Sequence, residues 1–305
     1  MNVADQNRRA AAASPAIDFK PLKFGPDLAR IAAPVISLIV LAVAVASLRD
    51  LDLAGVAAVV PRNPAFWLLF ALAYLAAPVA EWIIFRRLWR LPVEGLLPLI
   101  RKLIGNEILL GYVGEVYFYA WARRRADITA APFGAIKDVT VLSALVGNGV
   151  TLVMLAAAAP LYSDLLGMGS RALLLSLGAV LLTSVAAFVF RRRLFSLPRA
   201  ELRFVAAVHL ARIAATTGLT ALLWHLALPG VALSWWLLLA TLRLLLSRLP
   251  FLPNKDIVFA GIAVLLVGHD QPIANMMVMM ASAILATHVL LGIALMSADL
   301  VRAER

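Results

Sequence analysis

Six long apolar stretches constrain this chain more than any other feature. Each holds 18 to 26 residues with few or no charges. A helix needs about 20 such residues to cross roughly 30 Å of hydrocarbon. The chain is 63% hydrophobic and only 15% charged, which exceeds what a soluble core can bury. We therefore expect an all-α polytopic membrane protein with about six transmembrane helices: Ile31–Leu48, Pro64–Phe85, Val139–Ala159, Ala172–Phe190, Phe204–Pro229 and Pro272–Met296.

The basic residues predict the orientation of these spans. Arginines and lysines crowd residues 1–30, 86–90, 123–125 and 191–203, whereas residues 160–170, 229–234 and 269–274 have none. Cytoplasmic loops carry the excess of positive charge. We therefore expect a protein of a cytoplasmic-type membrane with both termini inside. The expected parts are a cytoplasmic tail over 1–29, a membrane domain over 30–298 and a short cytoplasmic end over 299–305.

Two further apolar stretches are interrupted and do not fit a simple crossing. Leu96–Ala122 contains several charges and glycines, and Val231–Gly268 has two short arms, Val231–Leu242 and Ile257–Val267, separated by a charged break. The flanks of the first stretch are both predicted cytoplasmic, and those of the second both external. We therefore expect two oppositely oriented re-entrant hairpins, an arrangement typical of transporters with inverted repeats.

The first predicted hairpin carries Asn106, Glu107 and Glu115. A charge at bilayer depth costs roughly 3 kcal/mol unless it is paired or hydrated. These groups could contact a lipid headgroup or a coupling ion. Alternatively, a carboxylate such as Glu115 could neutralise a basic residue on a neighbouring helix.

The second predicted hairpin carries three basic residues and one acid near its break. Arg243, Arg248 and Lys255 suit phosphate or another anion, and Asp256 could begin the following helix. The alternative is that the two arginines pair internally with a carboxylate, for which Glu81, Glu107 and Glu115 are the candidates.

A polar stripe follows the fifth predicted crossing. His209, Arg212, Thr216 and Thr220 recur at spacings of 3, 4 and 4 residues, which places them on one helical face. We expect Arg212 to face a cavity or an ion pair. The threonines are expected to bond back to their own helix, and His209 to lie at the cytoplasmic interface.

Several kinds of chemistry are not expected. The chain has no cysteine, and its four histidines are scattered, so we predict no metal site and no cofactor. His225 and His288 are isolated and are expected to be structural. No nucleotide-binding loop or nucleic-acid motif is present, so neither a nucleotide-driven pump nor a nucleic-acid partner is expected.

The two hairpins carry a family resemblance. The stretch from Asn106 to Glu115, ending in Gly114-Glu115, resembles the "Asn … Gly-Asp/Glu" motif of the lysylphosphatidylglycerol synthase transmembrane (flippase-like) family. Pro250 and Pro253 resemble that family's Pro-x-x-Pro-Gly-Gly segment, with Asn254-Lys255 in place of the glycines. The resemblance covers most of residues 30–298.

The resemblance implies lipid movement across the membrane. We expect a stand-alone, divergent member that binds an anionic or zwitterionic phospholipid. The termini are too short for a synthetase domain, so aminoacyl transfer is not expected. Two alternatives remain: a membrane transferase that uses Glu115 or Asp256 as acid or base, and a non-catalytic subunit of a lipid-biosynthesis complex. A homo-oligomer or a lipid-synthesis enzyme is a possible partner.

Overall fold

The longest helices carry the apolar runs. The computed structural model describes residues 60–108, 113–124, 132–166, 195–248, 255–267 and 271–303, and every regular element in these ranges is helical. Within these ranges, four helices are long and apolar enough to cross a membrane, as expected of a membrane-embedded protein. These are α4 (Pro64–Trp89), α7 (Pro132–Leu166), α10 (Arg199–Ala227) and α13 (Gln271–Ala303).

The exposed side chains of these helices support the same conclusion. Each long helix has a large apolar residue that is more than half exposed: Leu68 on α4, Val153 on α7, Leu210 on α10 and Leu290 on α13. Apolar surface on every side of a bundle is costly in water but favourable against lipid tails. The outer faces of the bundle therefore suit a hydrocarbon environment.

The four helices extend beyond the predicted apolar runs. For example, α10 begins at Arg199 rather than Phe204, and α4 continues past Phe85 through Arg86 and Arg87 to Trp89. Charged ends of this kind can reach the polar interface while the helix continues. The predicted spans Ile31–Leu48 and Ala172–Phe190, and the predicted tail over 1–29, lie outside the described residues.

The interrupted stretches form two pairs of short helices. The first pair is α5 (Leu96–Ile108), preceded by a 3₁₀ turn at Val93–Gly95, and α6 (Val113–Arg123); the second pair is α11 (Leu233–Ser247) and α12 (Lys255–Val267). At 1.5 Å per residue, helices of 11 to 15 residues are only about 16 to 23 Å long. None of them can span about 30 Å of hydrocarbon alone.

One predicted boundary is wrong. The first arm of the second hairpin was expected to end at Leu242, but α11 continues to Ser247 and includes Arg243. The reason is that the Arg243 charge is matched by Asp256, so it does not force the helix to end. The prediction that Asp256 opens the next helix is confirmed, since it lies in the first turn of α12.

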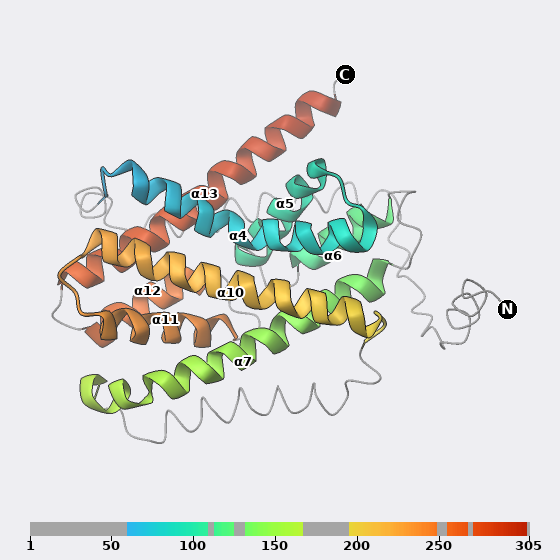
Figure 1. Ribbon diagram of the computed structural model, residues 1–305. Helices are drawn as coiled ribbons and strands as arrows, with labels where there is room; N and C mark the ends of the chain where they lie inside the picture. The colour runs from blue at the N-terminus through green and yellow to red at the C-terminus, as the bar shows by residue number, and fades with distance from the viewer. Residues whose placement is uncertain are drawn as a thin grey trace. The chain divides into compact units, whose positions relative to one another are not determined.

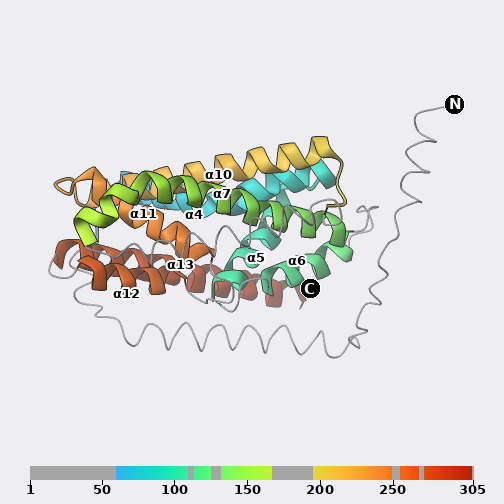
Figure 2. The same cartoon turned by 90° about the horizontal axis from the view of Figure 1, so that it is seen from below.

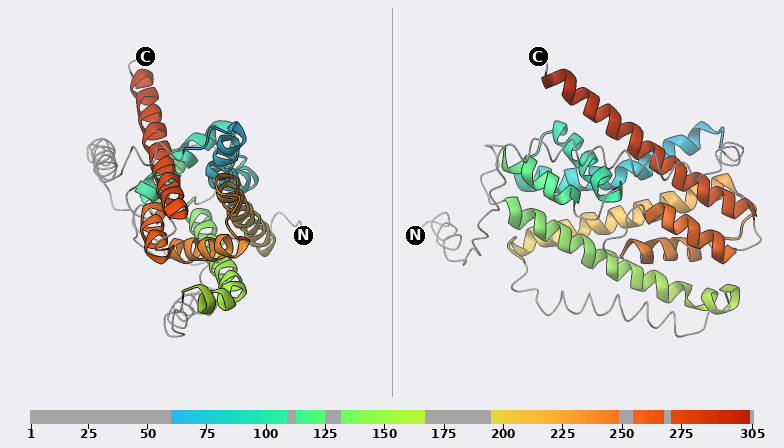
Figure 3. Two further views of the ribbon diagram at one scale, coloured as in Figure 1. Left: turned by 90° about the vertical axis from the view of Figure 1, so that its left-hand side faces the viewer. Right: turned by 180° about the vertical axis from the view of Figure 1, so that it is seen from behind.

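Helix α10 lies between α4 and α7 and packs against both (Figure 1). Figure 2 shows α4, α7 and α10 on one side of the bundle, α12 and α13 on the opposite side, and α11 between. In Figure 3, α13 runs obliquely across α4. The short pairs α5–α6 and α11–α12 each pack internally, and α5 also packs on α4.

Two buried apolar clusters lie along α4. One includes Phe66 and Phe70 with Trp224, Trp236 and four methionines of α13. The other includes Ile84 and Phe85 and packs against residues of α5, α6, α7 and α10. The segment of α4 between Phe70 and Ile84 is therefore flanked by apolar packing at both ends.

A buried carboxylate joins α7 to the segment that precedes α10. Asp138 is fully buried, and its Oδ2 accepts hydrogen bonds from the backbone N–H groups of Ser196 and Leu197, each at 2.7 Å. The Ser196 hydroxyl donates a third bond at 3.0 Å, and the Lys137 ammonium lies 3.4 Å from Oδ1. Asp138 therefore helps to fix where α10 starts.

This arrangement predicts a stability loss for Asp138→Ala. The variant leaves two backbone donors unsatisfied, and each such group costs about 1–3 kcal/mol. We expect a clear fall in the thermal unfolding temperature of the detergent-solubilised protein. Asp138→Asn retains one acceptor and should lose less. Equal unfolding temperatures for wild type and Asp138→Ala would contradict the assignment.

Candidate functional site

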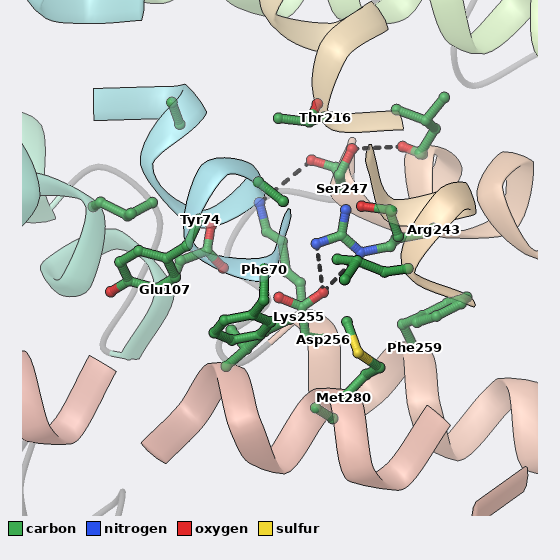
Figure 4. Close-up of a pocket in the computed structure, with 18 of the residues that line it drawn as sticks. Phe70, Tyr74, Glu107, Thr216, Arg243, Ser247, Lys255, Asp256, Phe259 and Met280 are labelled. Carbon is green, nitrogen blue, oxygen red and sulfur yellow. Dashed lines mark hydrogen bonds and ion pairs between the residues drawn. The ribbon is translucent and has the colours of Figure 1, made fainter. Parts of the chain in front are cut away.

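A cavity of about 230 Å³, lined by both charged and apolar side chains, lies between six helices of the described bundle. Its walls come from α4, α5, α10, α11, α12 and α13, and Figure 4 shows the labelled side chains converging on it. Tyr74 and Thr216 line it from near the middle of α4 and α10, so it is far from the ends of both spans. The volume is below the 300–1,000 Å³ typical of drug-sized ligands, so a small polar group fits it best.

The α11–α12 pair supplies the most strongly charged wall. The Arg243 guanidinium of α11 contacts the Asp256 carboxylate of α12 through Nε at 2.9 Å and Nη2 at 2.8 Å. Lys255 of α12 donates to the carbonyl oxygen of Ser247 at the end of α11, at 3.3 Å. A cation is favourable there because the carbonyls at a helix C-terminus carry partial negative charge. These two contacts hold the arms together with their charged groups facing the cavity.

Arg248 lines the same wall. Its Nε and Nη2 donate to the Ser247 hydroxyl at 3.0 and 2.7 Å. The guanidinium also packs against α7, since a Cβ added at Gly147 would overlap it. From the sequence, Glu81, Glu107 and Glu115 are candidate ion-pair partners of Arg243 and Arg248. In the structure, the ion-pair partner of Arg243 is Asp256 instead.

The α5–α6 pair contributes Glu107, at the end of α5. Glu107 lines the cavity together with Arg243, Lys255 and Asp256 of the α11–α12 pair. These segments are more than 100 residues apart in the chain. Residues from both pairs of short helices therefore line one cavity.

Asn106 and Glu115 do not line this cavity. The Asn106 side-chain oxygen accepts a hydrogen bond from the Gly114 N–H at 2.8 Å, which joins α5 to α6. Glu115 lies 3.4 Å from the buried Lys102 ammonium, which also contacts both oxygens of Glu81 on α4, at 2.8 and 2.9 Å. Glu115 thus follows the alternative interpretation, in which it neutralises a basic residue on a neighbouring helix.

Three members of the polar stripe on α10 line the cavity: Arg212, Thr216 and Thr220. Arg212 donates to the Ser143 hydroxyl of α7 at 3.0 Å. Thr216 bonds back to the Arg212 carbonyl at 2.9 Å, as predicted for a threonine in a helix. His209 was expected at the interface, but it is fully buried, with Nε2 3.2 Å from the Val139 carbonyl oxygen. The reason is that this part of α10 packs against α7.

Two cavity residues were missed by the sequence reasoning. The Tyr74 hydroxyl and the His288 Nδ1 are 2.7 Å apart and join α4 to α13. Both line the cavity, so His288 is not merely an isolated structural histidine. The sequence carries no signal for this pair because the residues are 214 positions apart.

The cavity has an excess of positive charge. Its lining includes four basic residues, Arg212, Arg243, Arg248 and Lys255, and two acidic ones, Glu107 and Asp256. The formal excess is two positive charges, which favours a bound anion. Among the residues that the structure describes, no three His, Asp or Glu side chains gather as a metal site would require.

Comparison with models of protein families, with curated proteins and with solved structures finds no match to this chain.

Proposed function

We propose that this protein is a lipid transporter that moves the phosphate headgroup of a membrane lipid through the cavity. The observation that carries this proposal is the composition of the cavity wall: four basic residues converge near the middle of a bundle of apolar helices. Charges at that depth are expensive and mark the path of a polar substrate. A phosphodiester supplies the negative charge that the excess cations would stabilise.

The combination of an apolar outer surface and charged side chains in the cavity suits a lipid substrate. The headgroup would bind among Arg212, Arg243, Arg248 and Lys255, while its acyl chains remain against the exposed apolar faces of the long helices. Guanidinium groups suit this role because they bind phosphate with two hydrogen bonds and stay charged. Asp256 would balance Arg243 when no lipid is bound.

The proposed topology has six spans and two opposed re-entrant hairpins in a bacterial inner membrane, with both termini cytoplasmic. The shortness of α5, α6, α11 and α12 supports re-entrant segments, because each is too short to cross alone. The hairpin motifs support a distant relation to the lysylphosphatidylglycerol synthase transmembrane family. Labelling of single introduced cysteines from either side of the membrane would test the orientation.

The alternative of a membrane transferase has less support. It was based on Glu115 or Asp256 as acid or base, and both carboxylates are engaged as counter-ions, Glu115 with Lys102 and Asp256 with Arg243. A non-catalytic subunit remains an untested prediction. Stoichiometric co-purification of a lipid-synthesis enzyme would favour it.

The proposal is tested by lipid translocation in reconstituted vesicles. Phosphatidylglycerol with a fluorescent acyl chain is placed in both leaflets, and dithionite quenches only the outer one. We expect wild type to raise the quenchable fraction from about half to nearly all. Arg248→Ala should slow translocation at least about tenfold, because a hydrogen bond to a charged group contributes about 1.5–3 kcal/mol.

Arg203→Ala is the matched control, since this arginine is exposed on α10 and does not line the cavity. It should translocate lipid at the wild-type rate. If wild type translocates no faster than protein-free vesicles, the proposed function is wrong. Equal translocation rates for wild type and Arg248→Ala would show that Arg248 does not take part in moving the headgroup.

A further inference from the structure

Glu107 differs from the other carboxylates near the cavity. Glu81 and Glu115 contact Lys102, and Asp256 contacts Arg243. Glu107 is half-buried, lines the cavity, and forms no hydrogen bond or ion pair with another described residue. Its charge is therefore not neutralised by one dedicated partner.

The surroundings of Glu107 are electrostatically mixed. The charged groups that act on Glu107 electrostatically are Glu115 of α6, Arg243 of α11, and Lys255 and Asp256 of α12. Two of these are carboxylates that repel a charge on Glu107, and two are cations already engaged elsewhere, with Asp256 and with the Ser247 carbonyl. Tyr74 of α4 also faces Glu107, and its hydroxyl is hydrogen-bonded to His288 of α13. Arg212 of α10 lies on the wall of the same cavity. In Figure 4, Glu107 lies beside Tyr74 and across from the pair formed by Arg243 and Asp256.

We propose that Glu107 is a proton-binding site coupled to anion binding in the same cavity. The inference rests on the proposed function and adds a coupling ion to it. Protonation of Glu107 converts a carboxylate to a neutral acid, with the proton taken from water that enters the cavity. The formal excess on the lining then rises from two positive charges to three.

The two binding events must favour each other. An anion in the cavity repels a charged Glu107, so it binds more tightly when Glu107 is protonated. Because coupling between two sites is reciprocal, the bound anion also promotes protonation of Glu107. A phosphate headgroup would thus enter the cavity together with a proton. A proton gradient could then drive lipid movement in one direction.

The test measures lipid binding and proton uptake together. The full chain in detergent is titrated with dihexanoyl phosphatidylglycerol, whose phosphodiester keeps one fixed charge over the range used. Calorimetry in two buffers with different ionisation heats gives the number of protons taken up per lipid. We expect wild type to bind the lipid about tenfold more weakly at about pH 8 than at about pH 5. At pH values between these two, lipid binding should be accompanied by net proton uptake.

Three variants complete the test. Glu107→Gln should bind tightly at both pH values with no proton uptake, because its amide cannot ionise. Glu107→Asp should retain the pH dependence. Glu94→Gln, which removes an exposed carboxylate outside this cavity, should behave as wild type. Intrinsic tryptophan fluorescence checks that each variant is folded.

The failures of the two proposals are distinguishable. Binding of wild type with pH-independent affinity would overturn the proton site and leave lipid binding intact. Proton uptake that persists in Glu107→Gln would also overturn the assignment of the proton site to Glu107. If that proton uptake then disappears in His288→Gln, the proton binds to the histidine. A folded protein that binds no lipid at any pH would overturn the proposed function itself.

Discussion

Replacement of Gly114 by alanine is expected to separate the two helices of the first hairpin. A Cβ at this position would overlap the backbone carbonyl oxygen of Lys102 and crowd the Asn106 side chain. Backbone atoms inside a helix cannot move aside cheaply, so α6 must shift away from α5. That shift would break the hydrogen bond from the Gly114 N–H to Asn106 and weaken the contact between Lys102 and Glu115.

We expect Gly114→Ala to lose about 3 kcal/mol of stability, at the upper end of what overpacking costs in a close-packed interior. Lipid translocation should fall with it, because Glu107 is carried by the same hairpin. The measurement is the thermal unfolding temperature in detergent, followed by tryptophan fluorescence, together with the vesicle assay.

Gly105 provides a matched control on the facing helix. A Cβ there would lie 3.5 Å from the Gly114 backbone, which is ordinary van der Waals contact. Alanine is also favoured over glycine inside a helix by roughly 0.5–1 kcal/mol. Gly105→Ala should therefore keep or slightly raise the unfolding temperature. The close approach at Gly114 is refuted if both alanine variants behave alike.

Helical periodicity groups His209, Arg212, Thr216 and Thr220 on one face of α10, and all of them except His209 line the cavity. Residues spaced by three and four share one helical face, and a face with Arg212 in an apolar helix must avoid lipid. This argument needs only the sequence, and Arg212, Thr216 and Thr220 do line the cavity.

The identity of the charge partners could not be predicted in this way. Asp256 pairs with Arg243 and Lys102 with Glu81, because packing brings different helices together and no local period encodes that packing. Asn106 illustrates the same limit, since its polar side chain serves the backbone of α6 rather than the cavity. The sequence therefore identified which residues must avoid lipid, whereas the fold determines which of them face the cavity.

Replacement of the buried Lys102 is expected to cause the second large loss of stability. Its side chain is 4% exposed and holds the carboxylates of Glu81 and Glu115, which are 15% and 19% exposed. Lys102→Met fills similar space but leaves two neighbouring negative charges without their cation. Removal of one partner from a buried ion pair costs about 3–5 kcal/mol. We expect a loss of this size in the unfolding free energy, seen as a much lower unfolding temperature and poor recovery in detergent.

Two comparisons separate lost charge pairing from lost packing. The triple variant Lys102→Met, Glu81→Gln, Glu115→Gln removes all three charges with little change of shape, so it should recover much of the stability lost by Lys102→Met alone. Arg87→Ala breaks an ion pair with Glu201 at the exposed end of α4 and should change the unfolding temperature little, because solvent screens that pair. Two results would show that the charge of Lys102 does not hold α4, α5 and α6 together. One is a fall in unfolding temperature for Lys102→Met that is as small as that for Arg87→Ala. The other is a triple variant that is no more stable than Lys102→Met.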